Sequence, residues 1–569
     1  MTRTFNWRLI FKTMGVLTTL EALFMLIPTF AAWWYNEPDM GAWIVASAIT
    51  WFSSWWMMLA GRKAERRVSE REGYVIVATI WLVYSIFGML PYWLSGALPS
   101  LTDAWYETMA GFTTTGSTVI ADVTSMTRSV LLWRALTQWI GGMGIIVLSV
   151  AILPLFGLGG MQLYSAEVTG VSYEKLSPRI ADTAKQMWLT YILLTIIEGT
   201  LLSLFGMSNF DAICHAMSTI STGGFSTRNT SVMLDSAGIQ WIIALFMLLS
   251  GINFTQLIYL FRGKPQRLIR DEETHWYIGS CIIVGIALAI GLFIWFAQIE
   301  SGWTSNWREG LTLAGDSLRT GIFTSISMIT STGFSAGDYM TWPPVLWLII
   351  FFLMVPGGAS GSTAGGVKWV RIGIFAKSAI TEIKRRIHPN AVIPVRFNGH
   401  TVSEQTTSNV MAFMFFYIAI IMVAAICFCA CGIGFNESLS VAVSMIGNVG
   451  VALGQFGPDG HYADFPMLAK WIATIVMLIG RLEIFTVLLL FSRVLWKKYN
   501  EVVSCTHIHR LCNGLFGCAL LGAPRTSSAM RLHPTMAHLC RSDGRKSTKG
   551  RGDRAIRFYR VIRFHTSNH

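Results

Sequence analysis

Long apolar segments recur along this 569-residue chain, and they constrain its fold more than any other feature of the sequence. Ten segments approach or exceed the roughly 20 residues that an α-helix needs to cross the hydrocarbon core of a bilayer. Only 13% of the residues are charged, whereas soluble domains carry roughly 25%. The sequence therefore predicts an all-α polytopic membrane protein. The predicted spans cover approximately residues 9–34, 42–61, 74–96, 129–156, 186–207, 238–261, 275–299, 343–376 (interrupted), 407–432 and 467–496.

Lys and Arg cluster between alternate spans, as in Gly61–Gly73 and Phe261–Glu273. Because such residues concentrate in cytoplasmic loops, the pattern predicts a cytoplasmic N-terminus. The first apolar segment is too long for a signal peptide and a second span follows it at once, so we interpret it as a membrane helix.

Four short motifs rich in Thr, Ser and Gly recur on the predicted outer side. They are "GFTTTGSTV" (Gly111–Val119), "ISTGGFS" (Ile220–Ser226), "TSTGFSA" (Thr330–Ala336) and "GNVGVAL" (Gly447–Leu453). A near-constant spacing of such motifs indicates duplicated structural units. Aligning Gly116, Gly223, Gly333 and Gly450 gives spacings of 107, 110 and 117 residues.

A semi-apolar segment too short to cross a membrane precedes each motif, for example Thr102–Phe112 or Asp316–Ile329. We predict that these segments are re-entrant half-helices. Irregular backbone at membrane depth is tolerated only where protein buries it or water lines it. Four such loops around one axis would present oxygen ligands to a monovalent cation. The alternative for any single motif is close packing of helices through small residues.

Two further features lie inside predicted spans. "PGGASGSTAGGVK" (Pro356–Lys368) interrupts the eighth span, and Val367 stands where a phosphate-binding Walker A loop requires Lys. We interpret this segment as a flexible constriction below the four loops; a simple helix kink is the alternative. Arg481 lies mid-span and must face protein or water. A structural pair with Glu198 or Glu483 is the alternative role, although residues two apart do not share a helix face.

These motifs give the chain a specific resemblance: it is similar to the TrkH/TrkG-type potassium uptake proteins of the Trk/Ktr/HKT superfamily. The resemblance extends over about residues 1–499 and implies two N-terminal helices plus four helix–pore loop–helix repeats around one pseudo-fourfold ion pore. The segments that carry it are "GFTTTGSTV", "TQWIGGMGIIVL" (Thr137–Leu148), "STISTGGFST" (Ser218–Thr227), "STGFSAGDY" (Ser331–Tyr339), "GGASGSTAGGVK" (Gly357–Lys368) and "MLIGRLEIFTVLLLF" (Met477–Phe491).

The resemblance also implies the location, partners and ligand of the chain. It implies potassium uptake across the bacterial cytoplasmic membrane, a homodimer and a cytoplasmic TrkA-like ring of nucleotide-binding domains. K⁺ is the transported ligand, no organic cofactor is expected, and the partners include membrane lipid but no nucleic acid. The expected units are residues 1–72 (two-helix unit), 73–184, 185–274, 275–405 and 406–500 (repeats one to four, the gating loop in the third), and 501–569 (a basic tail).

Residue by residue, the resemblance places a selectivity filter and a gate. The filter residues that would bind K⁺ are Thr114, Thr115, Gly116, Ser221, Thr222, Gly223, Ser331, Thr332, Gly333, Asn448, Val449 and Gly450. The gating residues are Gly357, Gly358, Gly361, Gly365, Gly366, Lys368 and Arg481. The fourth motif departs most, with Asn-Val in place of Ser/Thr-Thr. Lys368 would either anchor the gating loop or mark the cytoplasmic interface.

Other functions remain as rivals. A less selective Na⁺/K⁺ pathway or a cation symporter would need the same filter. A membrane enzyme would need a nucleophile with a base, or a metal motif such as HExxH, and none is visible in the sequence, so we do not expect an enzyme. The tail 501–569 fits nothing in the resembled family, and we expect it to be disordered.

Overall fold

The structure is a computed structural model that describes residues 6–62, 64, 70–142, 144, 180–299 and 307–492. One compact unit covers almost all of residues 1–498, and residues 499–569 form a second unit. The predicted tail, residues 501–569, lies outside the described residues. Most of the connection between the first two repeats also lies outside the described residues, as does the C-terminal part of the predicted span 129–156.

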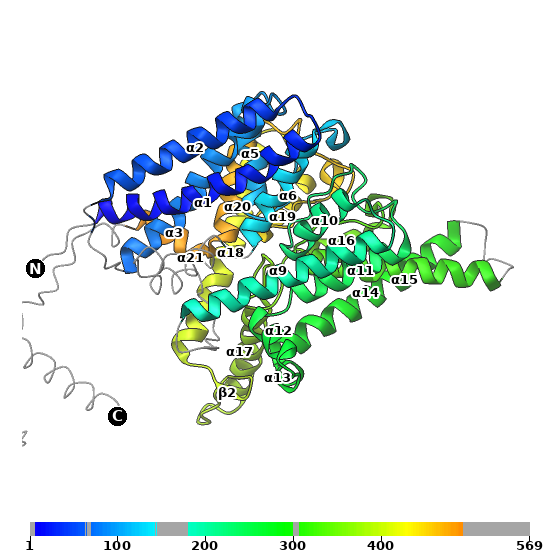
Figure 1. The fold of residues 1–569 in the computed structure, drawn as a ribbon. Helices are drawn as coiled ribbons and strands as arrows, with labels where there is room; N and C mark the ends of the chain where they lie inside the picture. The colour runs from blue at the N-terminus through cyan, green and yellow to red at the C-terminus, as the bar shows by residue number, and fades with distance from the viewer. Residues whose placement is uncertain are drawn as a thin grey trace, which may run out of the picture. The chain divides into compact units, whose positions relative to one another are not determined.

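Helices make up nearly all of the regular secondary structure in the described chain (Figure 1). A hairpin of α1 (Trp7–Trp34) and α2 (Met40–Ala60) precedes the rest. The two helices pack closely because Gly15 lacks a side chain: a Cβ there would lie 2.8 Å from the Met58 side chain and from the Ser54 carbonyl oxygen. Asn6 caps α1 by accepting a hydrogen bond from the Leu9 N–H.

Four units of similar design follow the hairpin, each with a long helix, a helix that ends at one of the four Thr/Ser/Gly motifs, and then a further helix or pair of helices. The first contains α3 (Glu70–Gly88), α4 (Leu90–Leu94), α5 (Leu101–Phe112), η1 (Val123–Ser125) and α6 (Arg128–Gly142). The second contains α9 (Ile180–Leu204), α10 (Asn209–Ile220), α11 (Ala237–Ser250), α12 (Phe254–Phe261) and α13 (Gln266–Arg270).

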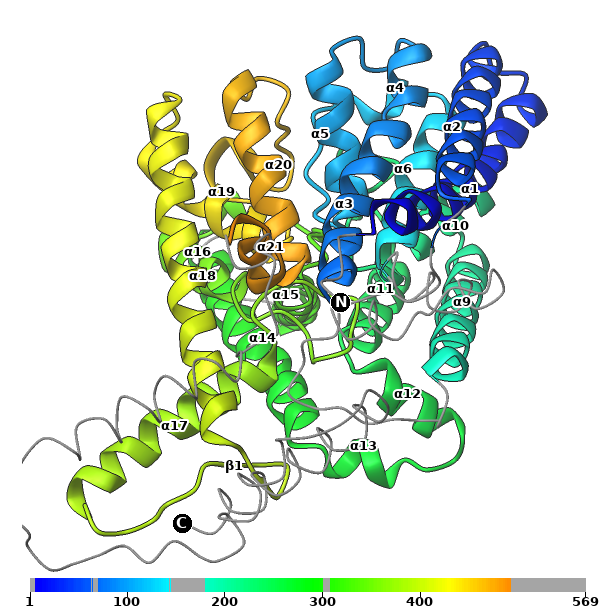
Figure 2. The same ribbon diagram turned by 90° about the vertical axis from the view of Figure 1, so that its left-hand side faces the viewer.

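The third unit adds a small hairpin to the same plan. It contains α14 (Glu272–Ile299), α15 (Trp307–Ile329), η3 (Tyr339–Thr341), α16 (Pro344–Leu353) and α17 (Trp369–Ile387). Its strands β1 (Arg396–Phe397) and β2 (His400–Thr401) are antiparallel, with Phe397 opposite His400. The fourth unit contains α18 (Glu404–Ala430), α19 (Phe435–Gly447), η4 (Gly454–Phe456), α20 (Met467–Arg481) and α21 (Glu483–Phe491). Figure 2 shows α13, α17 and β1 together at one end of this assembly.

Six described helices are long and apolar enough to cross a membrane, and two bent pairs raise the number to eight. The predicted continuous spans 238–261 and 467–496 are wrong in this respect. α11 and α12 meet at 107°, and α20 and α21 meet at 116°. At the first break Asn253 accepts from the Thr255 N–H at 2.8 Å, which caps a new helix instead of continuing the old one.

The predicted half-helices are present, with one correction. α5 and α10 have 12 residues and α19 has 13, so each is too short to cross a bilayer. Ser100 and Ser208 cap α5 and α10, and an Asp follows three residues later in each. The third segment, predicted as Asp316–Ile329, is only the C-terminal part of α15, which has 23 residues.

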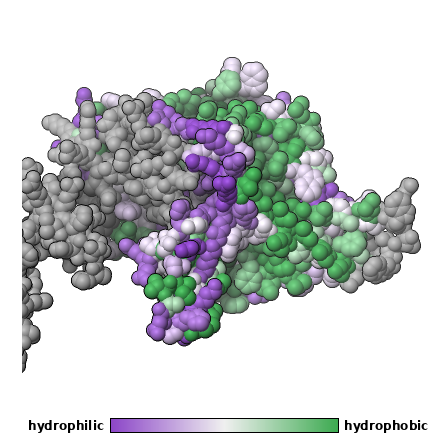
Figure 3. Space-filling view, turned by 90° about the horizontal axis from the view of Figure 1, so that it is seen from below, coloured by the Kyte–Doolittle hydropathy of each residue, from purple (hydrophilic) through white to green (hydrophobic). Residues whose placement is uncertain are grey.

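The outer surface is apolar where lipid would cover it. Ile282, Ile283, Ile286, Ile290 and Ile294 of α14 are all more than 40% exposed, and Figure 3 shows an extended hydrophobic surface next to a hydrophilic band. A soluble protein rarely exposes so continuous an apolar surface. The chain is a multi-pass membrane protein.

Candidate ion-conduction site

In every repeat the helix before the motif (α5, α10, α15 or α19) ends in the same backbone turn. Thr114, Thr222, Ser331 and Asn448 all have φ of 54–55°. Such a left-handed conformation costs a residue with a side chain about 1–2 kcal/mol. Two residues further on, a glycine again has positive φ, at 77°, 78°, 82° and 89° for Gly116, Gly224, Gly333 and Gly450. Strain that recurs at four equivalent positions indicates a functional constraint on the backbone.

The repeated turn corrects the alignment of the second motif by one residue. Gly224, not Gly223, is the counterpart of Gly116, Gly333 and Gly450. Gly223 corresponds to Thr115, since the N–H of each donates to the carbonyl five residues earlier at 2.8 and 2.9 Å. Ser221 consequently matches Thr113, and it precedes the left-handed position. The motif "TGG" is ambiguous because either glycine can adopt a positive φ.

The four turns contact one another in cyclic order. A Cβ added to Gly116 would lie 2.0 Å from the Gly223 carbonyl oxygen, and one added to Gly224 would lie 1.9 Å from that of Thr332. The same positions of the next two turns continue the cycle. A Cβ on Gly333 would lie 2.3 Å from the Val449 oxygen, and one on Gly450 would lie 2.1 Å from the Thr115 oxygen. The four turns therefore form a closed ring.

We call this arrangement the carbonyl ring: the turns that hold the carbonyls of Thr115, Gly223, Thr332 and Val449 and the glycine that follows each. Only glycine fits at its four junctions, because of both the positive φ and the close carbonyl. The C-terminal ends of α5, α10, α15 and α19 lead directly into the ring, so their partial negative charge favours a cation there.

Side chains brace the carbonyl ring from behind. The hydroxyl groups of Thr113 and Thr115 lie 2.8 Å apart, and those of Thr330 and Thr332 lie 2.7 Å apart. The Asn448 amide donates to the Thr115 hydroxyl at 2.9 Å. These polar groups are buried, and their mutual hydrogen bonds help to hold the turns in place.

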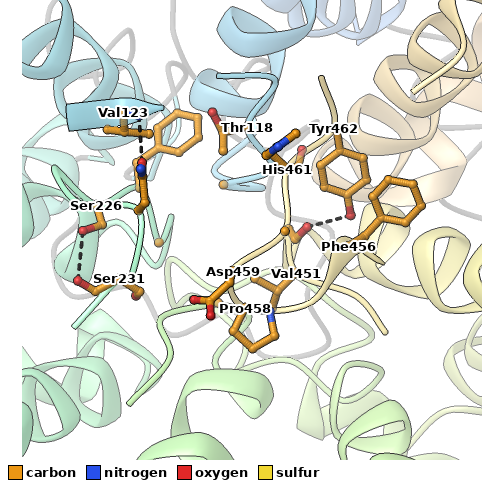
Figure 4. A pocket seen from close by; sticks show the side chains of 18 of the residues that line it. Thr118, Val123, Ser226, Ser231, Val451, Phe456, Pro458, Asp459, His461 and Tyr462 are labelled. Atoms are coloured by element: carbon orange, nitrogen blue, oxygen red, sulfur yellow. Dashed lines mark hydrogen bonds between the residues drawn. The ribbon is translucent and has the colours of Figure 1, made fainter. Parts of the chain in front are cut away.

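A vestibule opens above the carbonyl ring (Figure 4). It is an open cavity of about 670 Å³, including the space at its mouth, and residues of all four repeats line it, among them the four junction glycines. Tyr462 supports the fourth turn by donating its hydroxyl to the Gly450 carbonyl at 2.9 Å. Asp459 and His461 also line the cavity.

A buried ion pair fixes the wall of the vestibule between the first two repeats. Arg134 Nε lies 2.8 Å from Glu107 Oε1, and the two side chains are 2% and 0% exposed. Arg134 also donates to the Ser226 carbonyl at 3.0 Å and lies over the Phe225 ring. Glu107 accepts from the Val119 N–H at 2.9 Å. The pair thus ties α5 and α6 to the loop that follows the second turn.

The outer acidic groups differ in their surroundings. Asp103 pairs with Lys470 at 2.6 Å. Hydrogen bonds from Thr124 and Asn229 lower the pKa of Asp122 below its ordinary value. Partial burial, with the Asp338 carboxylate as a further cause, raises the pKa of Asp459.

The segment Pro356–Lys368 lies directly beneath the carbonyl ring. The Gly365 N–H donates to the Ser331 hydroxyl at 2.7 Å, and a Cβ on Gly365 would lie 2.3 Å from the Gly447 carbonyl oxygen. The Thr363 hydroxyl donates to the carbonyl of Ile220, at the end of α10, at 3.0 Å. The segment thus touches the turns of three repeats. We call it the glycine loop.

Glycine residues shape this loop, and buried contacts attach it to its surroundings. Gly357, Gly361 and Gly366 have φ of 76°, 77° and 73°. The Ala359 N–H donates to the Gly251 carbonyl at 2.8 Å. The same Glu273 oxygen accepts from the N–H groups of Ser360 and Val370 at 2.6 and 3.0 Å, which ties the loop and the start of α17 to α14. At Gly358 a Cβ would lie 2.7 Å from the Ser362 hydroxyl.

Arg481 joins three repeats below the carbonyl ring. It donates to the Thr363 carbonyl of the glycine loop at 2.8 Å and to the Gly141 and Gly142 carbonyls, at the end of α6, at 2.6 and 2.8 Å. Its partners in these bonds are backbone carbonyls. Glu483 pairs with Arg371 at 2.5 Å.

Lys368 and Glu198 are two further charged residues for which the sequence predicted a role. The Lys368 ammonium contacts the Ala364 carbonyl within the glycine loop, which fits an anchor. No hydrogen-bond partner reaches the carboxylate of buried Glu198 within the described part of the chain, so it does not serve Arg481.

Some residues that shape this site carry no motif in the sequence. Gln138, Glu107 and Arg134 are buried polar residues within α5 and α6, and Glu273 is a buried carboxylate in the first turn of α14; all four are less than 5% exposed. Polar groups in such surroundings are expected to find partners. That expectation identifies them as candidates but cannot name their partners, which lie on other helices and loops, some in the same repeat and some in the next.

Comparison with known proteins identifies the family of the chain. The sequence model of the TrkH family, described as a cation transport protein, matches residues 44–501. The Trk system potassium uptake protein TrkH of Halomonas elongata is 37% identical over 497 residues, which are 86% of this chain and 99% of the relative. The protein of the same name from Escherichia coli K12 is 36% identical, over 87% and 100% of the two chains.

A solved structure is similar as well. The crystal structure of the potassium transporter TrkH from Vibrio parahaemolyticus superposes with a TM-score of 0.76 and 31% identity, covering 87% of this chain and all of that one. The residues matched by the family model, 44–501, include the carbonyl ring, the vestibule and the glycine loop. The chain belongs to the TrkH family of cation transport proteins.

Proposed function

We propose that this protein takes up potassium through the carbonyl ring. The observation that carries the proposal is the cyclic contact of the four turns, in which each junction glycine faces a carbonyl of the next turn. Rings of backbone carbonyls replace the hydration shell of K⁺ in selective filters. The Thr, Ser, Asn and Val side chains at these turns are then braces, which explains why Asn-Val replaces Ser/Thr-Thr in the fourth turn without breaking the pattern.

The glycine loop and Arg481 form the gate in this proposal. The loop occupies the space beneath the carbonyl ring, and Arg481 attaches it to both the first and the fourth repeat. A guanidinium group close to the ion path repels cations. Opening would require these backbone hydrogen bonds to break and the loop to move, for which its glycines provide the conformational freedom.

We also propose partners for the pore and an orientation in the membrane. The relatives are named as parts of a Trk system, which supports a cytoplasmic nucleotide-binding TrkA-like partner, and the resemblance supports a homodimer. Basic residues of α13 and α17 lie at one end of the molecule (Figure 2). This distribution supports a cytoplasmic location for that end and an N-terminus on the same side of the inner membrane.

The test is cation influx in a bacterial host that lacks its own potassium uptake. We expect rubidium influx that exceeds sodium influx, and Gly116→Ser should weaken it strongly because its Cβ would collide with the Gly223 carbonyl. Gly96→Ser is the matched control: Gly96 has nearly the same φ, 76°, but no heavy atom lies within 4 Å of its Cβ position.

Each outcome decides a different point. Equal rubidium and sodium influx would favour the rival, a less selective Na⁺/K⁺ pathway. Dependence of rubidium influx on a proton or sodium gradient would favour a symporter. Absence of flux, with the protein present in the membrane and a TrkA-like partner supplied, would refute transport.

A further inference from the structure

One corner of the carbonyl ring differs from the other three. Thr115, Thr332 and Val449 carry side chains, whereas the corresponding Gly223 carries none. The Gln138 side chain, from α6 of the preceding repeat, fills this space. A Cβ on Gly223 would lie 2.4 Å from the Gln138 amide carbon. A residue of one repeat thus completes the turn of the next.

The Gln138 amide makes two hydrogen bonds to the second turn. Its Nε2 donates to the Gly223 carbonyl at 2.7 Å, and its Oε1 accepts from the Phe225 N–H at 3.1 Å. The orientation of the amide is unambiguous, because a carbonyl only accepts and a backbone N–H only donates. Gln138 is fully buried, so these bonds are shielded from water.

The first of these bonds makes the carbonyl ring electrically unequal. Within the described residues, Gly223 is the only one of the four ring positions whose carbonyl accepts a hydrogen bond from the protein. A carbonyl oxygen has two lone pairs, so it can accept from Gln138 and still face an ion. The amide N–H, however, draws electron density and places a partial positive charge beside that oxygen.

We propose that Gln138 is a specificity-determining residue of the pore, which weakens the Gly223 carbonyl as a cation ligand and holds the second turn at a fixed distance. This inference rests on the proposed function. Weaker and more rigid ligands disfavour the smaller, more strongly hydrated Na⁺ relative to K⁺. Gln138 therefore raises the preference for K⁺, although it does not itself contact the ion.

Removal of the amide should change selectivity more than rate. Gln138→Met keeps a similar volume and removes both hydrogen bonds. We expect the ratio of rubidium to sodium influx to fall about fivefold, which is the order of change that one net hydrogen bond supports. Gln138→Glu retains an acceptor for the Phe225 N–H and adds negative charge beside the ring, so sodium influx should rise here too.

The matched control is Gln240→Met. Gln240 is a buried glutamine in α11 that donates to the Val232 carbonyl at 2.9 Å, away from the carbonyl ring. Gln240→Met should lower the stability of the protein about as much as Gln138→Met does, but it should leave the ratio of rubidium to sodium influx unchanged. If Gln138 had only a structural role, Gln138→Met and Gln138→Glu would lower rubidium and sodium influx together and leave their ratio unchanged.

A double variant tests the space-filling part of the argument. Gly223→Ser alone should collide with Gln138, and Gln138→Ala alone should leave a cavity. Their combination rebuilds a corner with a side chain of its own, as in the first and third turns, and should restore rubidium influx beyond the product of the single effects.

The outcomes separate this inference from the proposed function. Selective influx in the unaltered protein with an unchanged ratio in Gln138→Met and Gln138→Glu overturns the role of Gln138 alone. Absence of rescue in the double variant contradicts the space-filling argument. Absence of cation flux in the unaltered protein overturns the proposed function and this inference with it.

Discussion

Substitution of the two adjacent glycines of the second turn gives the sharpest test of the ring geometry. Gly224→Ala places a side chain at φ 78° and its Cβ 1.9 Å from the Thr332 carbonyl oxygen. The left-handed conformation costs about 1–2 kcal/mol. Relief of the overlap requires backbone movement, which costs about 1–3 kcal/mol more. The total destabilisation of about 2–5 kcal/mol is localised at the contact between the second and third turns.

Gly223→Ala meets a different obstacle. Gly223 is not among the residues with positive φ, and its Cβ would meet the Gln138 side chain, which can rotate away. The cost is then the loss of two hydrogen bonds, about 1 kcal/mol each. We therefore expect Gly224→Ala to reduce rubidium influx by at least about tenfold, the equivalent of 1.4 kcal/mol in a barrier, and Gly223→Ala to reduce it less.

The assay is rubidium influx per amount of protein in the membrane, together with the thermal unfolding midpoint of each purified variant in nanodiscs. Gly279→Ala is the control, because no heavy atom lies within 4 Å of its Cβ position. Equal damage from both substitutions, or greater damage from Gly223→Ala, would refute the register of the second turn and the ring contact derived from it.

Three further predictions concern the gate and the vestibule. Arg481→Gln removes donors to three backbone carbonyls and should raise rubidium influx several-fold in a host without a TrkA-like partner; an unchanged basal influx would contradict the gate. Glu107→Leu leaves Arg134 buried without its carboxylate, which should cost about 3–5 kcal/mol and lower the thermal midpoint, and an unshifted midpoint would show that the pair contributes little. The pKa of Asp459 is raised by burial and by Asp338, so as the outer pH falls this group loses its negative charge earlier than an ordinary Asp. Rubidium influx at low ionic strength should therefore begin to fall at a higher pH in the unaltered protein than in Asp459→Asn, and parallel pH profiles would exclude the role.

The sequence by itself determined the membrane class and the repeated plan of the chain. Apolar runs of bilayer length and short segments before each Thr/Ser/Gly motif follow from local composition, and a bilayer admits few structures for them. The half-helices α5, α10 and α19 were predictable for this reason. The extent of α15 was not, because its first turns contain the polar residues Arg308 and Glu309, which do not continue an apolar pattern.

Only the tertiary structure decided how the repeats meet. Glycine tolerates positive φ at either position of "TGG", so the register of the second turn depends on which carbonyl of the next turn lies opposite. The attachment of Arg481 to the glycine loop and the contact of Gln138 with Gly223 likewise join residues far apart in the chain. Local sequence specifies how each turn can bend, whereas the neighbouring repeat specifies which bend is used.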